Sequence, residues 1–583
     1  MLNLTFGGTG RVITMKMSRK LILFYWLAML TLTLPGLAQA QFIFTTNGDD
    51  TITITGYTGS NSVLTIPTVI DGRSVTSIGD AAFETNTNLD EVTIPDGVAS
   101  IGVAAFWHCI NLSRINFPDS ITSIGSGAFT SCLGLTNVVI LANVTNIGTY
   151  AFFYCTNLVS ISVDAANPAY CSLDGVLFDK SKTALIQFPF AKAGSYSIPG
   201  GVTCIGEEAF AAEDFGGLES IPPACPGLTN LTIPGSVTNL AHDAFANCVG
   251  LVSVNLGDGI ANMGTYAFAG CSSLTDINIP GSIHVVGANA FDFCTNLANV
   301  TIGSGVTSIE SAAFRNCWYL TNIFIPDSVT NIGAVAFYAC LLRSIKIPSG
   351  VQSVGDYSFS GCIFTNVVIP DSVTNIGVDA FEACRNLTSV TLGSNICGIG
   401  DNAFFSCTSL TSITIPDSTT MIGYDAFDNC INLAAVTIGV NVSSIGNGAF
   451  GTCTNLSRIF FRGNAPTNVD DDLFFGIYLG PDIETIYFLP GSTGWSSTFD
   501  GRPTSIWLPQ MDAVESIQNG QTNLLKFNIN WASGQTVIVE ACTNLFAPIW
   551  QPIHTNVLDA ESTCFTEPDS TSCPARFYRI RSQ

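Results

Sequence analysis

The chain reads Ser409-Leu410-Thr411-Ser412-Ile413-Thr414-Ile415-Pro416-Asp417-Ser418, then Met421-Ile422-Gly423, Ala426-Phe427 and Cys430, and this pattern returns along most of its length. Most copies of its phenylalanine are 23 residues apart, whereas the steps into Phe359 and Phe381 are 22 residues long. These copies are Phe83, Phe106, Phe129, Phe152, Phe210, Phe245, Phe268, Phe291, Phe314, Phe337, Phe359, Phe381, Phe404, Phe427 and Phe450. A fixed period of this length predicts a solenoid whose coils share one core.

The first part of each unit is predicted to be a short strand. In residues 410–416, Ile413 and Ile415 alternate with Thr414, so the two isoleucines should point inward and the threonine outward. Pro416 ends this strand, where its missing N–H removes no ladder bond.

The second part of each unit is predicted to form the other sides of the coil. An apolar pair such as Val373 and Ile376 marks a second buried edge, and Gly377 suits a tight corner after it. The stretch Ala380–Cys384 is predicted to be a single helical turn that carries Phe381 into the core. The expected fold is therefore a solenoid of short parallel strands and one-turn helices.

Composition excludes disorder and nucleic-acid binding. The 583 residues are 47% hydrophobic and only 11% charged, which is too apolar for a disordered chain. The formal net charge is −24, whereas a protein that binds the phosphates of a nucleic acid needs clustered Lys and Arg. The acidity indicates solubility outside the cell, with attraction to a cationic partner as the alternative.

The N-terminus resembles a secretory signal. A basic segment, Lys16–Lys20, precedes an apolar stretch, Leu21–Leu34, and Ala38-Gln39-Ala40 is a small-residue cleavage site that would leave Gln41 first. No cysteine follows the site, so a lipid anchor is not expected, and no later apolar run is long enough for a transmembrane anchor. The sequence therefore predicts a secreted or cell-surface protein.

Most of the cysteines share one position of the unit, three residues after the phenylalanine. This column comprises Cys109, Cys132, Cys155, Cys248, Cys271, Cys294, Cys317, Cys340, Cys362, Cys384, Cys407, Cys430 and Cys453. We expect buried free thiols there, because stacked side chains are parallel and meet poorly for disulfides, and no histidine joins the column to bind a metal. Cys564 and Cys573, in contrast, could form a disulfide.

These patterns divide the chain into four segments. We expect a signal peptide at 1–40 (removed), an N-terminal cap at 41–60, the solenoid at 61–508 and a β-rich domain, of sandwich type, at 511–583. Insertions break the period near 156–200, where Asp174-Gly175 predicts a hairpin turn, and near 211–228. The last strand of the repeats is expected at 455–461.

The repeated unit resembles the BspA-type subclass of leucine-rich repeats. Residues 362–384 and 384–407 show its pattern of Cys, Leu, Ile, Pro, Gly and Ala-Phe, and the likeness covers about residues 60–508. The resemblance implies a bacterial secreted or surface protein, as family members typically are, and some members bind host or matrix proteins or other cells. The segment after residue 511 is similar to end domains of secreted bacterial proteins.

No arrangement for catalysis is visible in the sequence. The histidines His108, His242, His284 and His554 occupy different positions of the repeat or another domain, so they do not converge. Asp470–Asp472 is better explained as a solvated loop than as a calcium site. We therefore expect no enzyme, no cofactor and no metal. An enzyme acting on polysaccharide is the least favoured alternative, since the repeat singles out no pair of carboxylates.

The outward position of the strand supplies a candidate binding site. Most coils have a short polar residue there, but three successive coils have a large apolar or cationic one. The candidate partner-binding residues are Trp318, Tyr319, Phe324, Arg343, Lys346 and Val368. Aromatic and Arg side chains are enriched at binding hot spots, so we expect one patch that binds a protein of a host, a matrix or a neighbouring cell, or a glycan. The alternatives are drift of the consensus, and a structural matrix or surface-layer protein without a specific ligand.

Overall fold

The computed structural model describes residues 41–206, 209–210, 224–469, 472–474, 485–519, 522–531, 535–546, 548–558, 562–566 and 576–582. The chain forms two compact units, Met1–Leu251 and Val252–Gln583, and each is described by itself. The predicted signal peptide, most of the predicted insertion near 211–228, and Cys573 lie outside the described residues.

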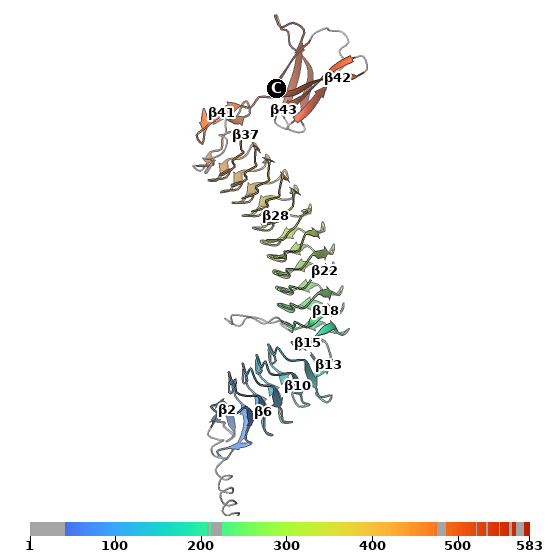
Figure 1. Ribbon diagram of the computed structural model, residues 1–583, viewed down its shortest axis with the longest axis vertical. Coiled ribbons are helices and arrows are strands. Elements are labelled where there is room, and N and C mark those ends of the chain that lie inside the picture. The colour runs from blue at the N-terminus through green and yellow to red at the C-terminus, as the bar shows by residue number, and fades with distance from the viewer. Residues whose placement is uncertain are drawn as a thin grey trace, which may run out of the picture. The chain divides into compact units, whose positions relative to one another are not determined.

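In both units, successive coils stack as rungs and pair through parallel strands (Figure 1). The outward-facing surface of the first strand of each coil is called the strand face below. In the first unit the first strands are β3 (Val63–Thr65), β6 (Glu91–Thr93), β8 (Arg114–Asn116), β10 (Asn137–Ile140), β12 (Ser160–Val163), β16 (Gly194–Ser197) and β18 (Leu228–Thr232). The second strands are β5 (Arg73–Ile78), β7 (Ser100–Ile101), β9 (Ser123–Ile124), β11 (Asn146–Ile147), β17 (Cys204–Ile205) and β19 (Asn239–Leu240).

The second unit repeats this arrangement over more coils. Its first strands are β20 (Ser253–Asn255), β22 (Asp276–Ile279), β24 (Asn299–Ile302), β26 (Asn322–Phe324), β29 (Asn366–Val368), β31 (Ser389–Thr391), β33 (Ser412–Thr414), β35 (Ala435–Ile438), β37 (Arg458–Phe461), β39 (Thr485–Phe488) and β41 (Arg502–Ile506). Its second strands are β21 (Asn262–Met263), β23 (Val285–Val286), β25 (Ser308–Ile309), β27 (Asn331–Ile332), β28 (Ser353–Val354), β30 (Asn375–Ile376), β32 (Gly398–Ile399), β34 (Met421–Ile422), β36 (Ser444–Ile445) and β38 (Asn468–Val469).

The alternation predicted for the first strand is confirmed. In β33, Ile413 is buried between exposed Ser412 and Thr414, and Ile415 after it is also buried. The strand pairs in parallel with β35, so each inward residue lies beside its counterpart in the next coil. Identical registers therefore follow from identical spacing in the sequence.

The predicted one-turn helix is wrong: no residue that the structure describes lies in a helix. Asp379 and Ala383 both have a φ of 54°, in the left-handed region, which a right-handed helical turn does not allow. The N–H groups of Phe381 and Ala383 donate to the carbonyls of Ala403 and Phe405 in the next coil, each at 2.8 Å. Pairing between coils has replaced helical bonding, and this side of the coil is a stack of tight turns.

The core of each unit is a column of phenylalanine rings. Phe83 and Phe106 stack with centroids 4.9 Å apart in the first unit, and Phe404 and Phe427 stack at 5.2 Å in the second. The apolar pairs of the strands surround this column, and almost all of them are fully buried. Each coil thus completes the core of its neighbours.

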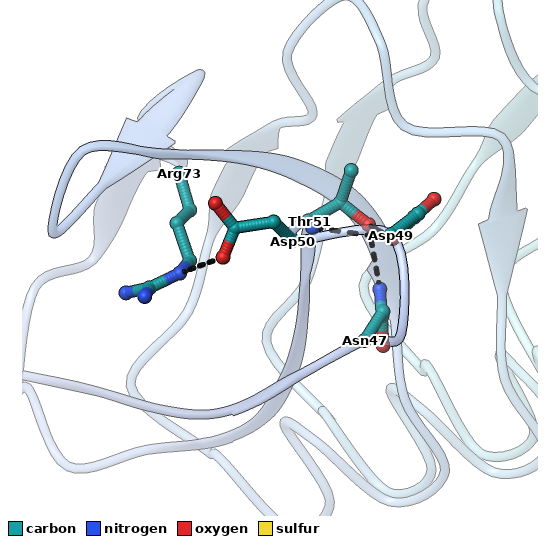
Figure 2. A network of polar contacts seen from close by, with 5 residues as sticks. All are labelled: Asn47, Asp49, Asp50, Thr51 and Arg73. Atoms are coloured by element: carbon teal, nitrogen blue, oxygen red, sulfur yellow. Dashed lines mark hydrogen bonds and ion pairs between the residues drawn. The ribbon is translucent and has the colours of Figure 1, made fainter.

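The first unit begins with a hairpin that covers the first coil. Strands β1 (Phe42–Thr46) and β2 (Ile52–Tyr57) are antiparallel, and β2 pairs in parallel with β5. Figure 2 shows how the hairpin turn is held: Thr51 N–H and Oγ1 donate to Asp49, Asn47 Nδ2 donates to Thr51 Oγ1, and Arg73 on β5 pairs with Asp50 at 2.7 Å. Strand β4 (Val69–Ile70) forms a small antiparallel hairpin with β5.

The insertion near 156–200 contains three antiparallel strands. These are β13 (Tyr170–Leu173), β14 (Val176–Asp179) and β15 (Ala184–Gln187). The predicted Asp174-Gly175 turn is confirmed: both residues have positive φ, 51° and 79°, as a two-residue hairpin loop requires. Strand β15 then pairs in parallel with β17, so the repeats resume.

The expectation that residues 455–461 form the last strand of the repeats is wrong. Strand β39 pairs in parallel with β37, and β41 pairs in parallel with β39. The repeat consensus is no longer recognisable in β39. Ile486 of this strand is nevertheless fully buried, so the strand still packs against the core. Strand β40 (Thr498–Phe499) closes this end as a hairpin with β41.

Two antiparallel sheets follow in the second unit. One has the order β42 (Gln510–Asn519), β43 (Thr522–Asn530), β46 (Ser562–Thr566), and the other β45 (Gln551–Val557), β44 (Thr536–Cys542), β47 (Phe577–Ser582). Phe527 of β43 and Val539 of β44 belong to one buried cluster, so the sheets share a core as a sandwich does. The same cluster includes Leu489 and Trp507 from the end of the repeats.

Candidate functional site

The strand face presents one outward column of side chains per unit. In the second unit the column comprises Asn255, Asn278, Thr301, Phe324, Lys346, Val368, Thr391, Thr414, Thr437 and Phe460, of which Thr437 is buried. In the first unit its members include Thr93, Asn116, Val139 and Ser162, and Asn116 Nδ2 donates to Thr93 Oγ1. The usual occupant is therefore a short polar side chain that can bond along the stack.

The six residues predicted to bind a partner are all exposed. They are Trp318, Tyr319, Phe324, Arg343, Lys346 and Val368, called the docking patch below. Phe324 and Val368 lead the column, with 63% and 60% of their surface exposed. Such large apolar side chains gain about 1.5–3 kcal/mol each when they are fully covered.

The strand register brings part of this patch together. A parallel bridge joins Asn322 to Ser344, so Phe324 and Lys346, each two residues further on, lie on neighbouring coils. Val368 ends β29 on the coil after Lys346. Trp318 and Tyr319 are placed differently, because they lie in the turn that precedes β26 rather than in the column.

One cation of the patch is already paired. Lys346 Nζ lies 3.0 Å from Asp327 Oδ1, and both side chains are about two-thirds exposed. An exposed pair of this kind contributes at most about 1 kcal/mol, but it removes most of the local positive charge. Both Lys346 and Arg343 are exposed, but Lys346 is paired with Asp327.

The patch coincides with an irregularity in the repeat. One residue is missing between Cys340 and Leu342, and another between Cys362 and Phe364, compared with the spacing in other copies. The strand ladder stops at the same place: residues 341–347 make a single bridge to β26 and form no strand. The two 22-residue steps of the sequence were the signal for this, but the spacing alone did not say which element is lost.

Sequence reasoning missed what covers the end of the column. Phe460 lies 4.4 Å from the ring of Trp507 and 5.3 Å from that of Tyr487, and Phe460 and Tyr487 are only partly exposed. Trp507 is buried, and its carbonyl accepts a hydrogen bond from Trp531 Nε1 at 3.3 Å. Phe460 and Tyr487 therefore pack against a buried cluster in which Trp507 joins the sandwich residues Phe527 and Val539.

The described residues gather no cluster that could hold a metal ion. His242 Nε2 lies 2.7 Å from Asp243 Oδ2. Of the acidic run at 470–472, only Asp472 is described, and it is exposed. Within the described residues, no helix has the length and the apolar composition needed to cross a membrane.

The cysteine column is buried and unreactive in its environment. Burial raises the pKa of the Cys109 thiol to about 12 and that of Cys384 well above its usual range. Each thiol points to the preceding coil: Cys384 Sγ donates to the carbonyl of Phe359 at 3.2 Å. A buried thiol that is protonated and hydrogen-bonded in this way is a packing group, not a nucleophile.

Several solved bacterial proteins are similar in structure. A leucine-rich repeat protein from Bacteroides ovatus is 23% identical, covers 80% of this chain and 98% of its own, and gives a TM-score of 0.40. A leucine-rich cell surface protein from Faecalibacterium prausnitzii is 29% identical over 48% of this chain and 92% of its own, with a TM-score of 0.34. A leucine-rich repeat protein from Eubacterium ventriosum is 24% identical over 54% of this chain and 95% of its own, with a TM-score of 0.40.

The sequence itself matches a family model. No curated protein matches the chain. The model of the BspA-type leucine-rich repeat region, which spans six copies of the repeat, matches residues 60–169, 223–342, 330–457 and 378–480. These matches cover more than half of the chain and carry the same Leu, Ile, Pro and Ala-Phe positions that form its strands and turns. The chain therefore belongs to the family of BspA-type leucine-rich repeat proteins.

Proposed function

We propose that this chain is an extracellular binding protein that holds another protein on its strand face, at the docking patch. The observation that carries the proposal is the contrast within one column. Phe460 is a large residue that packs against Trp507. Phe324 and Val368 are also larger than the usual short polar residues of the column, but they remain exposed. In a column of short polar residues, exposed apolar groups of this size mark a contact surface.

The shape of the surface suits a protein partner. A solenoid offers a long, open face rather than a closed cleft, and the docking patch combines aromatic, aliphatic and cationic side chains. This composition resembles the hot spots of protein interfaces more than a catalytic site. A glycan bound on Trp318 and Tyr319 is the alternative ligand, and catalysis is not part of the proposal.

An extracellular location is supported by the N-terminal sequence and by the family. Residues 16–40 have the basic, apolar and small-residue segments of a secretory signal. The acidic composition, with a net charge of −24, favours solubility outside the cell. The proposal therefore places the strand face where host, matrix or neighbouring-cell proteins are available.

The test compares the chain with a double variant, Phe324→Thr and Lys346→Thr. Both changes restore the polar character of the column without entering the core, so the melting temperature should stay within about 2 °C. The unaltered chain and the double variant are each immobilised and exposed to proteins from isolated cell surfaces and matrix. We expect the double variant to retain less of the bound proteins, and quantitative mass spectrometry measures the retained amounts. The matched control is Val139→Thr, an exposed apolar residue of the same column in the first unit.

Two outcomes would contradict the proposal. Equal retention by the unaltered chain and the double variant would return the docking patch to drift of the consensus. Retention of nothing by either, at concentrations where about micromolar binding is detected, would favour a structural matrix protein without a specific ligand. Loss of binding in Val139→Thr as well would show that the column as a whole, not the patch, is recognised.

A further inference from the structure

The sandwich of the second unit carries an exposed apolar loop. Phe546 is fully exposed (102%), Ile549 is 78% exposed, and Leu545 is half exposed. These three residues, called the apolar loop below, lie between β44 and β45. Nothing in the described part of the chain covers them, and such a group of bulky side chains marks an interaction surface.

The end of the strand face packs against a cluster that it shares with the sandwich of its own chain. Phe460 and Tyr487 contact the buried cluster that contains Trp507, from the end of the repeats, and Phe527, from the sandwich. The docking patch is a second set of large apolar residues in that same column, several coils earlier. Phe324 and Phe546 are both exposed in one molecule, so the contact between them is not made within it.

Charge favours the same pairing. Two copies of a chain with a net charge of −24 repel one another over most of their surfaces. The stretch from Ala541 to Ile553 contains no charged residue, and the docking patch holds Arg343 beside the neutral pair of Lys346 with Asp327. Neither surface brings an unpaired negative charge to the contact, so two copies that meet there repel one another little.

We propose that the partner at the docking patch is a second copy of this chain, which inserts its apolar loop there. The inference rests on the proposed function and names the partner of that site. The two contacting surfaces differ, so the contact is head-to-tail, and each copy keeps one free loop and one free patch. Association therefore continues into open chains of molecules, and salt strengthens it by screening the repulsion.

The test is sedimentation velocity on the expected secreted form, residues 41–583. The unaltered protein forms oligomers that grow with concentration and with salt. Phe546→Ser and Phe324→Thr each sediment as monomers, because each lacks one surface, and the association constant falls at least about tenfold. A mixture of the two variants forms dimers and nothing larger, because one intact loop meets one intact patch. Val557→Thr and Val139→Thr, which alter exposed valines elsewhere, assemble normally.

Three results overturn the inference: an unaltered chain that stays monomeric, a single variant that still assembles, or a mixture that fails to form dimers. Unchanged melting temperatures of the variants exclude misfolding as a cause. If the unaltered chain is monomeric but its Phe324→Thr and Lys346→Thr double variant retains fewer other proteins, the proposed function stands. Only the identification of the partner as a second copy is then overturned. Assembly that persists in Phe324→Thr but not in Phe546→Ser shows that the loop docks elsewhere.

Discussion

At the scale of single residues, the phenylalanine column has the largest energetic role. Phe381 has no exposed surface and lies between Phe359 and Phe404, with ring centroids 5.5 and 5.2 Å away. We predict that Phe381→Ala destabilises the second unit by about 3–5 kcal/mol, since it leaves a cavity in the middle of the stack. Urea denaturation followed by circular dichroism measures it, and a change below about 1 kcal/mol would mean that the ring does not support the core.

Ser358 is the odd member of an otherwise alanine column. Its side chain is fully buried, and Oγ has no hydrogen-bond partner among the described residues. We predict that Ser358→Ala stabilises the second unit by about 1 kcal/mol, because the cost of the unpaired hydroxyl disappears. The control is Ser360→Ala: its Oγ donates to Glu382 at 3.0 Å, so this change should destabilise. Thermal unfolding of both variants decides it, and a loss of stability in Ser358→Ala contradicts the assignment.

The glycine column shows how closely the coils approach. A Cβ at Gly400 would lie 2.6 Å from the carbonyl carbon of Gly377, and one at Gly377 would lie 2.5 Å from Asp356 Oδ1. Neither glycine requires a positive φ. The sequence points to a tight corner at this position, and the structure adds a second constraint, which comes from the preceding coil.

At the scale of one element, the cysteine column predicts a sharp pattern of thiol reactivity. Its thiols are buried, whereas Cys204, Cys397 and Cys564 are exposed. We predict that a maleimide labels Cys204 and Cys397 of the folded chain within minutes and the column only after denaturation, whereas the labelling of Cys564 tests the disulfide expected with Cys573. Peptide mass spectrometry identifies the labelled sites. Rapid labelling of Cys384 in the folded state would show that the column opens.

The turns of the second unit carry crowded carboxylates that predict a pH effect. Burial, with Asp428 and Asp401 nearby, raises the pKa of Asp425 above its ordinary 3.8. The folded chain then holds this proton to higher pH than the unfolded chain. Ionisation therefore lowers stability as the pH rises from the unfolded pKa through the folded one. We predict that Asp425→Asn stabilises the chain at pH 7 and changes little at pH 3, measured by urea denaturation.

Asp276 is the control for that prediction. Hydrogen bonds from Thr275 and Asn299 lower the pKa of Asp276, so its ionised form stabilises the folded chain above the unfolded pKa, and this gain is lost as the pH falls through the folded one. Asp276→Asn should therefore destabilise at pH 7. If the free energy of unfolding at pH 7 changed in the same direction in both variants, net charge alone, rather than the local surroundings, would determine the effect.

At the scale of the whole molecule, the second unit joins repeats and sandwich through Trp507. Trp507 is 7% exposed and packs 4.4 Å from Phe460. We predict that Trp507→Ala loosens the sandwich by about 3–5 kcal/mol and leaves the repeats intact. Limited proteolysis should then remove residues after about 510 while the remaining fragment keeps its far-ultraviolet spectrum. Uniform resistance along the chain would show that the contact is dispensable.

The period of the sequence by itself determined the architecture. Equal spacing fixed the phase of the strands, the inward isoleucines, the phenylalanine stack and the buried cysteines, because every coil must meet an identical neighbour in register. It also singled out the residues that interrupt the outward column. These features depend on spacing and on side-chain character alone, both of which a single sequence contains.

Only the tertiary structure decided which groups pair between coils and which surfaces are covered. The predicted helical turn failed because the N–H groups of Asp379, Phe381 and Ala383 bond to carbonyls of the next coil. In the sequence, Phe324 and Phe460 look alike, as large residues at one position of the repeat. Phe460 is covered by Trp507 and Phe324 is exposed, since covering depends on a segment that is distant in the chain and returns only in the folded state.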